Sequence, residues 1–81
     1  MSTDLSNKRL LILGGTQISC EIVRIARQLG CFIGVADYNS VADSPAKQIA
    51  DAVYDVSVMD IDAVVKLIKD EHIDGVTVGF A

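Results

Sequence analysis

The residues best suited to bind a ligand follow an apolar run near the start of the chain. Four aliphatic residues precede Gly14 and Gly15, and a helical repeat of apolar residues begins at Ile18. This order predicts a buried strand that turns tightly into a helix. In open parallel sheets, ligands bind beyond the carboxyl ends of the strands, where the N–H groups of a helix N-terminus can bind anions. We therefore expect the segment from Gly14 to Gln17 to border a ligand-binding cleft.

The glycine pair and Thr16 also match the start of the GGTGxxG turn of some nicotinamide-binding domains. The match is incomplete, because Gln17 and Cys20 stand where that turn has glycines, and a side chain at Gln17 would intrude on a pyrophosphate. Asp37 favours dinucleotide binding, since it ends the next predicted strand about 20 residues after the glycines, where an acidic residue binds a ribose diol. Both features also have a structural interpretation. The glycines allow a tight turn, and the aspartate accepts hydrogen bonds from the loop that follows it.

No catalytic or metal-binding group can be assembled at this cleft from the sequence. The single histidine, His72, falls at the end of a predicted helix, where a cation suits the helix dipole. Cys20 and Cys31 fit neither a CxxC motif nor a zinc site and are expected to be buried, reduced thiols. We therefore expect this chain to bind a ligand without catalysing a reaction by itself.

Composition excludes several classes of protein. The chain has 81 residues, is 51% hydrophobic and carries a formal net charge of −4, which is typical of one small globular domain. Its basic residues are scattered and form no stripe that would bind nucleic acid. No apolar run approaches the roughly 20 residues of a membrane helix, and residues 1–8 are polar, with no secretory signal. We expect a cytosolic protein with a flexible segment at residues 1–8.

Hydrophobic periodicity predicts strands and helices that alternate along the chain. Ser44-Pro45 predicts the start of a short helix, and Ser57 to Asp60 matches a capping box before a longer one. The expected strands are Arg9–Leu13, Phe32–Ala36, Ala52–Val56 and Val76–Phe80, and the expected helices are Ile18–Leu29, Ala46–Ala50 and one that begins at Ile61.

The helix at Ile18–Leu29 is expected to bury its large aliphatic residues and to expose its charged ones. Ile18, Ile22, Ile25, Ala26 and Leu29 share one face, which should pack on the sheet. Because parallel crossovers are right-handed, the element order predicts an α/β fold: a Rossmann-like open parallel sheet of four strands in the order 3-2-1-4, with helices on both faces.

The motifs taken in order resemble the N-terminal domain of ATP-grasp ligases, such as biotin carboxylase and the large chain of carbamoyl phosphate synthetase. The resemblance covers residues 9–81. It is carried by the glycine turn, by the aspartate after the second strand, and by the order "Ser-Pro-Ala, Ala-Asp" that follows. The matching segments are Leu11–Ile18, Ala26–Gly30, Val35–Asp37, Ser44–Ala46 and Ile49–Ala52.

The resemblance implies a domain, cut short at its C-terminal end, that forms one wall of an ATP-dependent ligase. Such enzymes phosphorylate a carboxylate with ATP and magnesium, which lie between later domains, and a nitrogen nucleophile attacks the acyl phosphate. Gly14, Gly15, Thr16 and Gln17 would then face the substrate, with Asp37 as a weaker candidate. The chain alone would need no cofactor and hold no metal. Its partners would be the remaining ATP-grasp domains and a small-molecule substrate, without nucleic acid or membrane.

Two other functions are consistent with the sequence. The chain could be a self-contained Rossmann-type module that binds a nucleotide or dinucleotide, or a purely structural domain, since such a fold need not bind a ligand. The last predicted strand, Val76–Phe80, has neither lysine nor proline to protect an open edge. We therefore expect the isolated chain to self-associate.

Overall fold

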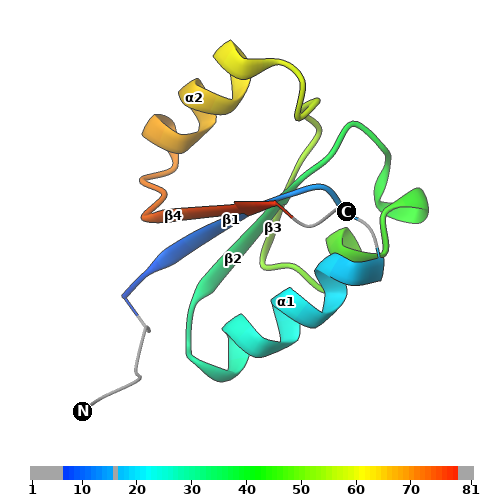
Figure 1. Ribbon diagram of the computed structural model, residues 1–81, viewed down its shortest axis with the longest axis vertical. Helices are drawn as coiled ribbons and strands as arrows, with labels where there is room; N and C mark the ends of the chain where they lie inside the picture. The colour runs from blue at the N-terminus through cyan, green and yellow to red at the C-terminus, as the bar shows by residue number, and fades with distance from the viewer. Residues whose placement is uncertain (1–6, 16, 79–81) are drawn as a thin grey trace.

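The computed structural model describes residues 7–15 and 17–78, which form a parallel four-stranded sheet between helices. The strands run in the order β3-β2-β1-β4, as the sequence predicts (Figure 1). The elements are β1 (Arg9–Leu13), α1 (Gln17–Gln28), β2 (Phe32–Ala36), the 3₁₀ turns η1 (Val41–Asp43) and η2 (Pro45–Gln48), β3 (Ala52–Tyr54), α2 (Ile61–Asp70) and β4 (Gly75–Val78).

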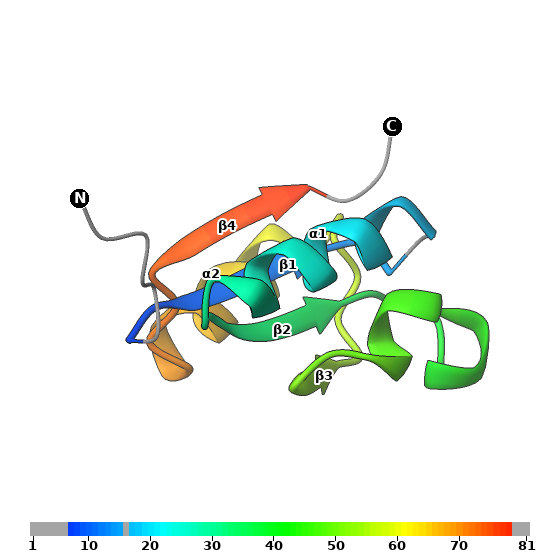
Figure 2. The ribbon, with the colours of Figure 1, turned by 90° about the horizontal axis from the view of Figure 1, so that it is seen from below.

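The two long helices lie on opposite faces of the sheet, which confirms the expected doubly wound architecture (Figure 2). The helix α1 connects β1 to β2, whereas α2 brings the chain back across the sheet from β3 to β4. Right-handed crossovers that run in opposite directions along a sheet place their helices on opposite faces. The carboxyl ends of three strands meet, since Leu13 pairs with both Ala36 and Val78.

The core lies under the two central strands. Leu11 and Ile12 of β1, and Ile33 and Val35 of β2, are fully buried. Layers on both faces of the sheet explain why these strands are continuously apolar.

The face of α1 that packs on the sheet differs from the expected one. Ser19, Cys20, Val23 and Ala26 are the buried residues of this helix. By contrast, Ile18 and Ile25, both expected in the core, are more than half exposed. The prediction was correct for Ala26 and wrong for Ile18 and Ile25, because periodicity finds an apolar stripe without showing which edge of it meets the sheet. Small residues on the buried side let the helix lie close to the strands.

The connections also differ from the sequence-based expectations. The 3₁₀ turn η2 replaces the short helix expected at Ala46–Ala50, η1 was not expected, and β3 ends at Tyr54, two residues early. The cap of α2 is Asp60, whose Oδ1 accepts a hydrogen bond from the Ala63 N–H at 3.2 Å, so Ser57 is not the helix cap. In η2 the Lys47 N–H bonds the Ser44 carbonyl and the Ile49 N–H bonds the Ala46 carbonyl, so the hydrogen bonds span three residues and form a 3₁₀ turn rather than an α-helix.

The last strand, β4, forms one edge of the sheet. It pairs with β1 over Gly75 to Val78, and the expected continuation to Phe80 lies outside the described residues. Val76 and Val78 are about half exposed on the face that carries α2. Self-association through this edge stays a prediction, which light scattering of the 81-residue chain can test.

Candidate functional site

The turn between β1 and α1 is built on two glycines with different roles. Gly14 has a φ angle of 100°, a conformation that a side chain strongly disfavours. Its N–H donates to the carbonyl oxygen of Ala36 at 2.8 Å, and its carbonyl accepts the hydroxyl of Ser19. Gly14 therefore extends the pairing of β1 with β2 by one step before the chain turns into α1.

Gly15 is required by close packing rather than by its backbone angles. Its N–H donates to Oδ2 of Asp37 at 2.6 Å, and its carbonyl accepts the N–H of Ala46 at 3.2 Å. A Cβ atom at this position would lie 2.8 Å from Cβ of Ser44, well inside van der Waals contact. The turn η2 thus packs directly on the glycine backbone.

Asp37 is buried and holds the loops at the ends of β1 and β2 together. Its side chain is engaged through both oxygens, because Oδ1 accepts the backbone N–H of Asn39 at 2.9 Å and its side-chain amide at 3.1 Å, while Oδ2 accepts Gly15. Burial by itself would raise the pKa of this carboxyl. The N–H groups of Asn39 and Gly15 and the charge of Lys47 outweigh that effect and lower the pKa below its ordinary value.

Lys47 is a buried cation that the sequence analysis did not single out. Its side chain is fully buried, and Nζ donates to the carbonyl oxygens of Asp37 (2.8 Å) and Asn39 (2.6 Å) and to Oδ1 of Asp55 (2.6 Å). This ammonium ties the loop after β2 to the loop after β3. Its only signal in the sequence is its place two residues after Pro45, on the turn that covers Gly15.

Ser44 carries the one hydroxyl that this arrangement leaves unpaired. The residue is 1% exposed, and among the described residues its Oγ is the only buried side-chain oxygen or nitrogen without a hydrogen-bond partner. It caps no turn with its side chain, contrary to the N-cap role expected from Ser44-Pro45. Proline does stand at the start of the turn, as expected.

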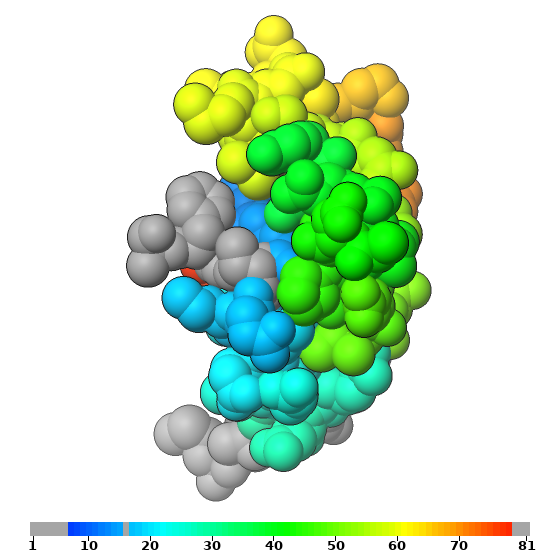
Figure 3. Space-filling view, turned by 90° about the vertical axis from the view of Figure 1, so that its right-hand side faces the viewer, coloured from blue at the N-terminus to red at the C-terminus, as the bar shows by residue number. Residues whose placement is uncertain are grey.

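The surface at the carboxyl ends of the strands is therefore a firmly held platform (Figure 3). In this view η1 and η2 (green) pack beside the start of α1 (light blue). Atoms of β1 (blue) are visible between α1 and the chain before α2 (yellow). Of the predicted site residues, Gly14, Gly15 and Asp37 are buried together, whereas Gln17 is exposed at the first position of α1. Thr16 lies outside the described residues.

The other residues considered from the sequence lie away from this platform. His72 follows α2 with a positive φ angle of 53°, at the opposite end of β4 from Val78. Cys20 is buried, and Cys31 is half-buried rather than buried. Within residues 7–15 and 17–78, no three potential metal ligands cluster, and no helix is long and apolar enough to cross a membrane.

Known proteins share both the sequence and the fold of this chain. A formate-dependent phosphoribosylglycinamide formyltransferase of Erythrobacter litoralis (strain HTCC2594) is 34% identical over 66 residues, which cover 82% of this chain and 16% of that protein. The N5-carboxyaminoimidazole ribonucleotide synthetase of Thermotoga maritima superposes with a TM-score of 0.78 at 27% identity, over 90% of this chain and 19% of the synthetase. No protein-family model matches the chain.

Two further solved structures extend the comparison. The ADP complex of an N5-carboxyaminoimidazole ribonucleotide synthetase matches with a TM-score of 0.76 and 33% identity, over 90% of this chain and 18% of that one. A glycinamide-RNase-transformylase T from Mycobacterium tuberculosis shares the fold, with a TM-score of 0.79 at 24% identity, over 88% of this chain and 20% of its own. The chain thus matches the N-terminal region of ATP-grasp ligases and spans one fifth or less of their length.

Proposed function

We propose that this chain is the substrate-facing N-terminal domain of a cytosolic ATP-dependent ligase that joins a carboxylate to a nitrogen nucleophile. The observation that carries the proposal is the match to the formyltransferase along 82% of the chain. The fold shared with two N5-carboxyaminoimidazole ribonucleotide synthetases supports it. ATP and magnesium are assigned to the rest of the ligase, and this domain supplies one wall of the cleft.

The names of the relatives point to one type of reaction. The formyltransferase is named as formate-dependent, and the synthetase is named for a ribonucleotide with a carboxyamino group, so both names combine a small carboxylate with a nitrogen acceptor. In the proposed reaction a carboxylate oxygen attacks the γ-phosphorus of ATP and ADP leaves. The amine nitrogen then attacks the acyl carbon, and phosphate leaves.

The hydrogen bonds of the turn distinguish predicted site residues that hold the fold from those that can contact a substrate. The N–H and carbonyl groups of Gly14 and Gly15 are all used within the fold, and both oxygens of Asp37 are occupied. These three residues fix the path of the turn. Substrate contact is assigned to Gln17, the exposed first residue of α1, and to Thr16 by its position between Gly15 and Gln17.

The same geometry disfavours a self-contained dinucleotide-binding module. A ribose diol at Asp37 would have to displace N–H groups held at 2.6 Å and 2.9 Å in a site that is 7% exposed. A side chain at Gln17 stands where a pyrophosphate would approach the backbone.

Two assays test the proposal. In the ligase that carries this domain, hydroxylamine should trap an acyl phosphate as a hydroxamate, with ATP consumed only when formate, bicarbonate or another small carboxylate is supplied. Calorimetric titration of residues 1–81 with Mg-ATP should give no heat of binding, because ATP is assigned to other domains. Saturable micromolar binding by the isolated chain would instead support the nucleotide-binding module.

A further inference from the structure

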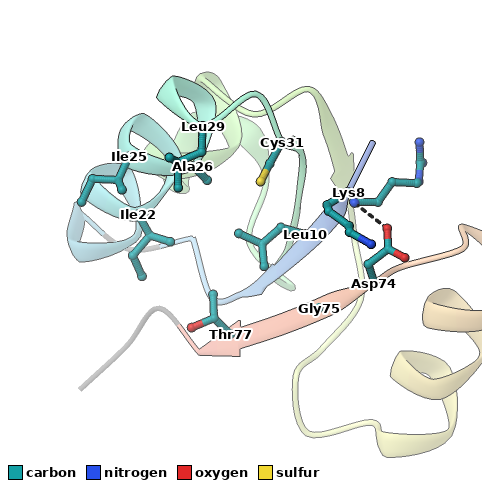
Figure 4. A pocket seen from close by; sticks show the side chains of 11 residues that line it. Lys8, Leu10, Ile22, Ile25, Ala26, Leu29, Cys31, Asp74, Gly75 and Thr77 are labelled. Carbon is teal, nitrogen blue, oxygen red and sulfur yellow. Dashed lines mark hydrogen bonds between the residues drawn. The ribbon is translucent and has the colours of Figure 1, made fainter. Parts of the chain in front are cut away.

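An apolar groove of about 440 Å³ runs between α1 and β4, apart from the glycine turn (Figure 4). Its wall on the helix side is formed by Ile22, Ile25 and Leu29, and Leu10 of β1 forms the floor. On the other side, Gly75 and Thr77 of β4 leave it open. The groove ends near Lys8 and Asp74, at the start of β1 and β4.

The helix α1 places its larger apolar residues on the groove and its smaller residues on the sheet. Ser19, Cys20, Val23 and Ala26 are buried in the domain. Ile25, in contrast, is 58% exposed, and Ile22 and Leu29 are only partly buried. Burying a fully exposed large aliphatic side chain is worth about 1.5–3 kcal/mol, so a partner that covered the exposed parts of these three residues would gain a fraction of that value at each.

We propose that this groove is the docking site of an amphipathic helix from a later part of the ligase chain, an inference that rests on the proposed function. Packed helices lie about 8–10 Å apart, which is close to two strand spacings of about 4.8 Å. A helix beside α1 would therefore lie over β4 and its open edge. The apolar lining of the groove suits the apolar face of one such helix.

The direction of the crossovers excludes one origin of this helix, namely a crossover from β4 to a further strand. A further strand added beyond β4 by a right-handed crossover would carry its helix on the same face as α2, as the connection from β3 to β4 does. The groove lies on the α1 face. A helix in this groove would therefore have to pack back on this domain from elsewhere, and the matched ligases have four fifths or more of their length outside the matched region.

Charge at the end of the groove defines one property of the occupant. Lys8 is exposed and forms no ion pair with any residue in 7–15 or 17–78, whereas the neighbouring Asp74 is engaged with the N–H of Arg9 at 2.8 Å. The docking helix should therefore carry an apolar face and an acidic side chain that reaches Lys8.

The test compares the ligase with the isolated 81-residue chain. Ile25→Asp should lower the melting temperature of the ligase by about 5 °C or more, because it places a charge in a closed interface. In the isolated chain the same change should shift melting by less than about 2 °C, because Ile25 is already 58% exposed. The matched control is Gln28→Asp, on an exposed position at the end of α1 outside the groove; any cost of an acidic residue at a helix C-terminus should be the same in both proteins.

Thiol labelling gives an independent readout. Cys31 lines the groove and is half-buried, whereas Cys20 is buried in the core. Cys31 should react with a thiol reagent at least about tenfold more slowly in the ligase than in the isolated chain. Equal rates in the two proteins, or equal tolerance of Ile25→Asp, would overturn the proposal. So would self-association of the isolated chain that Ile25→Asp abolishes, since a second copy would then occupy the groove.

The outcome for the groove is separable from the outcome for the proposed function. A ligase that forms hydroxamate but leaves Cys31 fully reactive refutes the docking helix alone. A protein that protects Cys31 but consumes no ATP with any carboxylate supports the docking helix and refutes the ligase activity.

Discussion

Replacing Gly15 with alanine is the most direct test of how the glycine turn is held. The added Cβ would lie 2.8 Å from Cβ of Ser44 and 3.3 Å from Oδ2 of Asp37. Carbon atoms in contact normally lie about 3.5–4.0 Å apart, so the two loops must separate by roughly 0.7 Å or more. Ser44 cannot rotate away, because its Cβ is fixed to a backbone that is itself buried.

The structure gives the size of the effect. Overpacking of this kind costs about 1–3 kcal/mol, and weakening the hydrogen bond from Gly15 to the Asp37 carboxylate adds part of about 1.5–3 kcal/mol. We therefore expect the free energy of unfolding to fall by about 2–4 kcal/mol, which corresponds to a melting temperature lower by roughly 10–25 °C in a domain of this size. Valine at this position should cost more still.

Urea unfolding followed by far-ultraviolet circular dichroism is the appropriate assay, because the chain has no tryptophan. The matched control is Gly75→Ala, where the new Cβ would meet Leu10 at an ordinary 3.6 Å, and it should be nearly neutral. Adding Ser44→Gly to Gly15→Ala should recover part of the loss. If Gly15→Ala unfolds within about 0.5 kcal/mol of the wild type, close packing does not explain the glycine.

Three further predictions concern the buried polar groups around this turn. Ser44→Ala should raise the free energy of unfolding by about 1 kcal/mol, because it removes a buried hydroxyl without a partner; a loss of stability in urea would contradict this. The pKa of Asp37 is lowered in the fold, so its ionised carboxylate adds to the free energy of unfolding. This contribution is complete above about pH 3.9, the pKa of an unfolded aspartate, and disappears as the pH falls through the pKa of the folded state. Asp37→Asn should therefore flatten the acid side of the stability profile, and an unchanged profile would show that another group controls it. Lys47→Met should cost about 2–4 kcal/mol, because the buried carbonyl oxygen of Asp37 and the partly buried one of Asn39 lose their donor, whereas Asp55→Asn should cost little, since the Asp55 side chain is 80% exposed; equal losses in thermal melts would refute this difference.

Local signals in the sequence predicted the sheet and its strand order. Apolar runs that stop at glycine or aspartate mark the strands, and the right-handed crossover then permits the order 3-2-1-4, which the structure confirms. The glycine turn was also predicted from local order, because two glycines end the apolar run. In the structure Gly14 adopts a φ angle of 100°, which glycine tolerates.

Features that depend on contacts between distant segments could not be predicted in this way. Periodicity identified an apolar stripe on α1 but not its orientation, because the orientation depends on which residues fit closely against β1 and β2. The role of Lys47 likewise could not be predicted from the sequence. A lysine two residues after a proline carries no local sign that it will be buried against the loops that follow two strands.

The sequence by itself therefore determined the four strands, the two long helices, the glycine turn between β1 and α1, and the class of ligase that it resembles, because these follow from local residue order. Only the tertiary structure decided that Asp37 and Lys47 hold the glycine turn in place, and that α1 leaves Ile25 on an open groove. The physical reason is that burial and hydrogen-bond partners are properties of the packed chain, in which residues 22 positions apart, such as Gly15 and Asp37, come into contact.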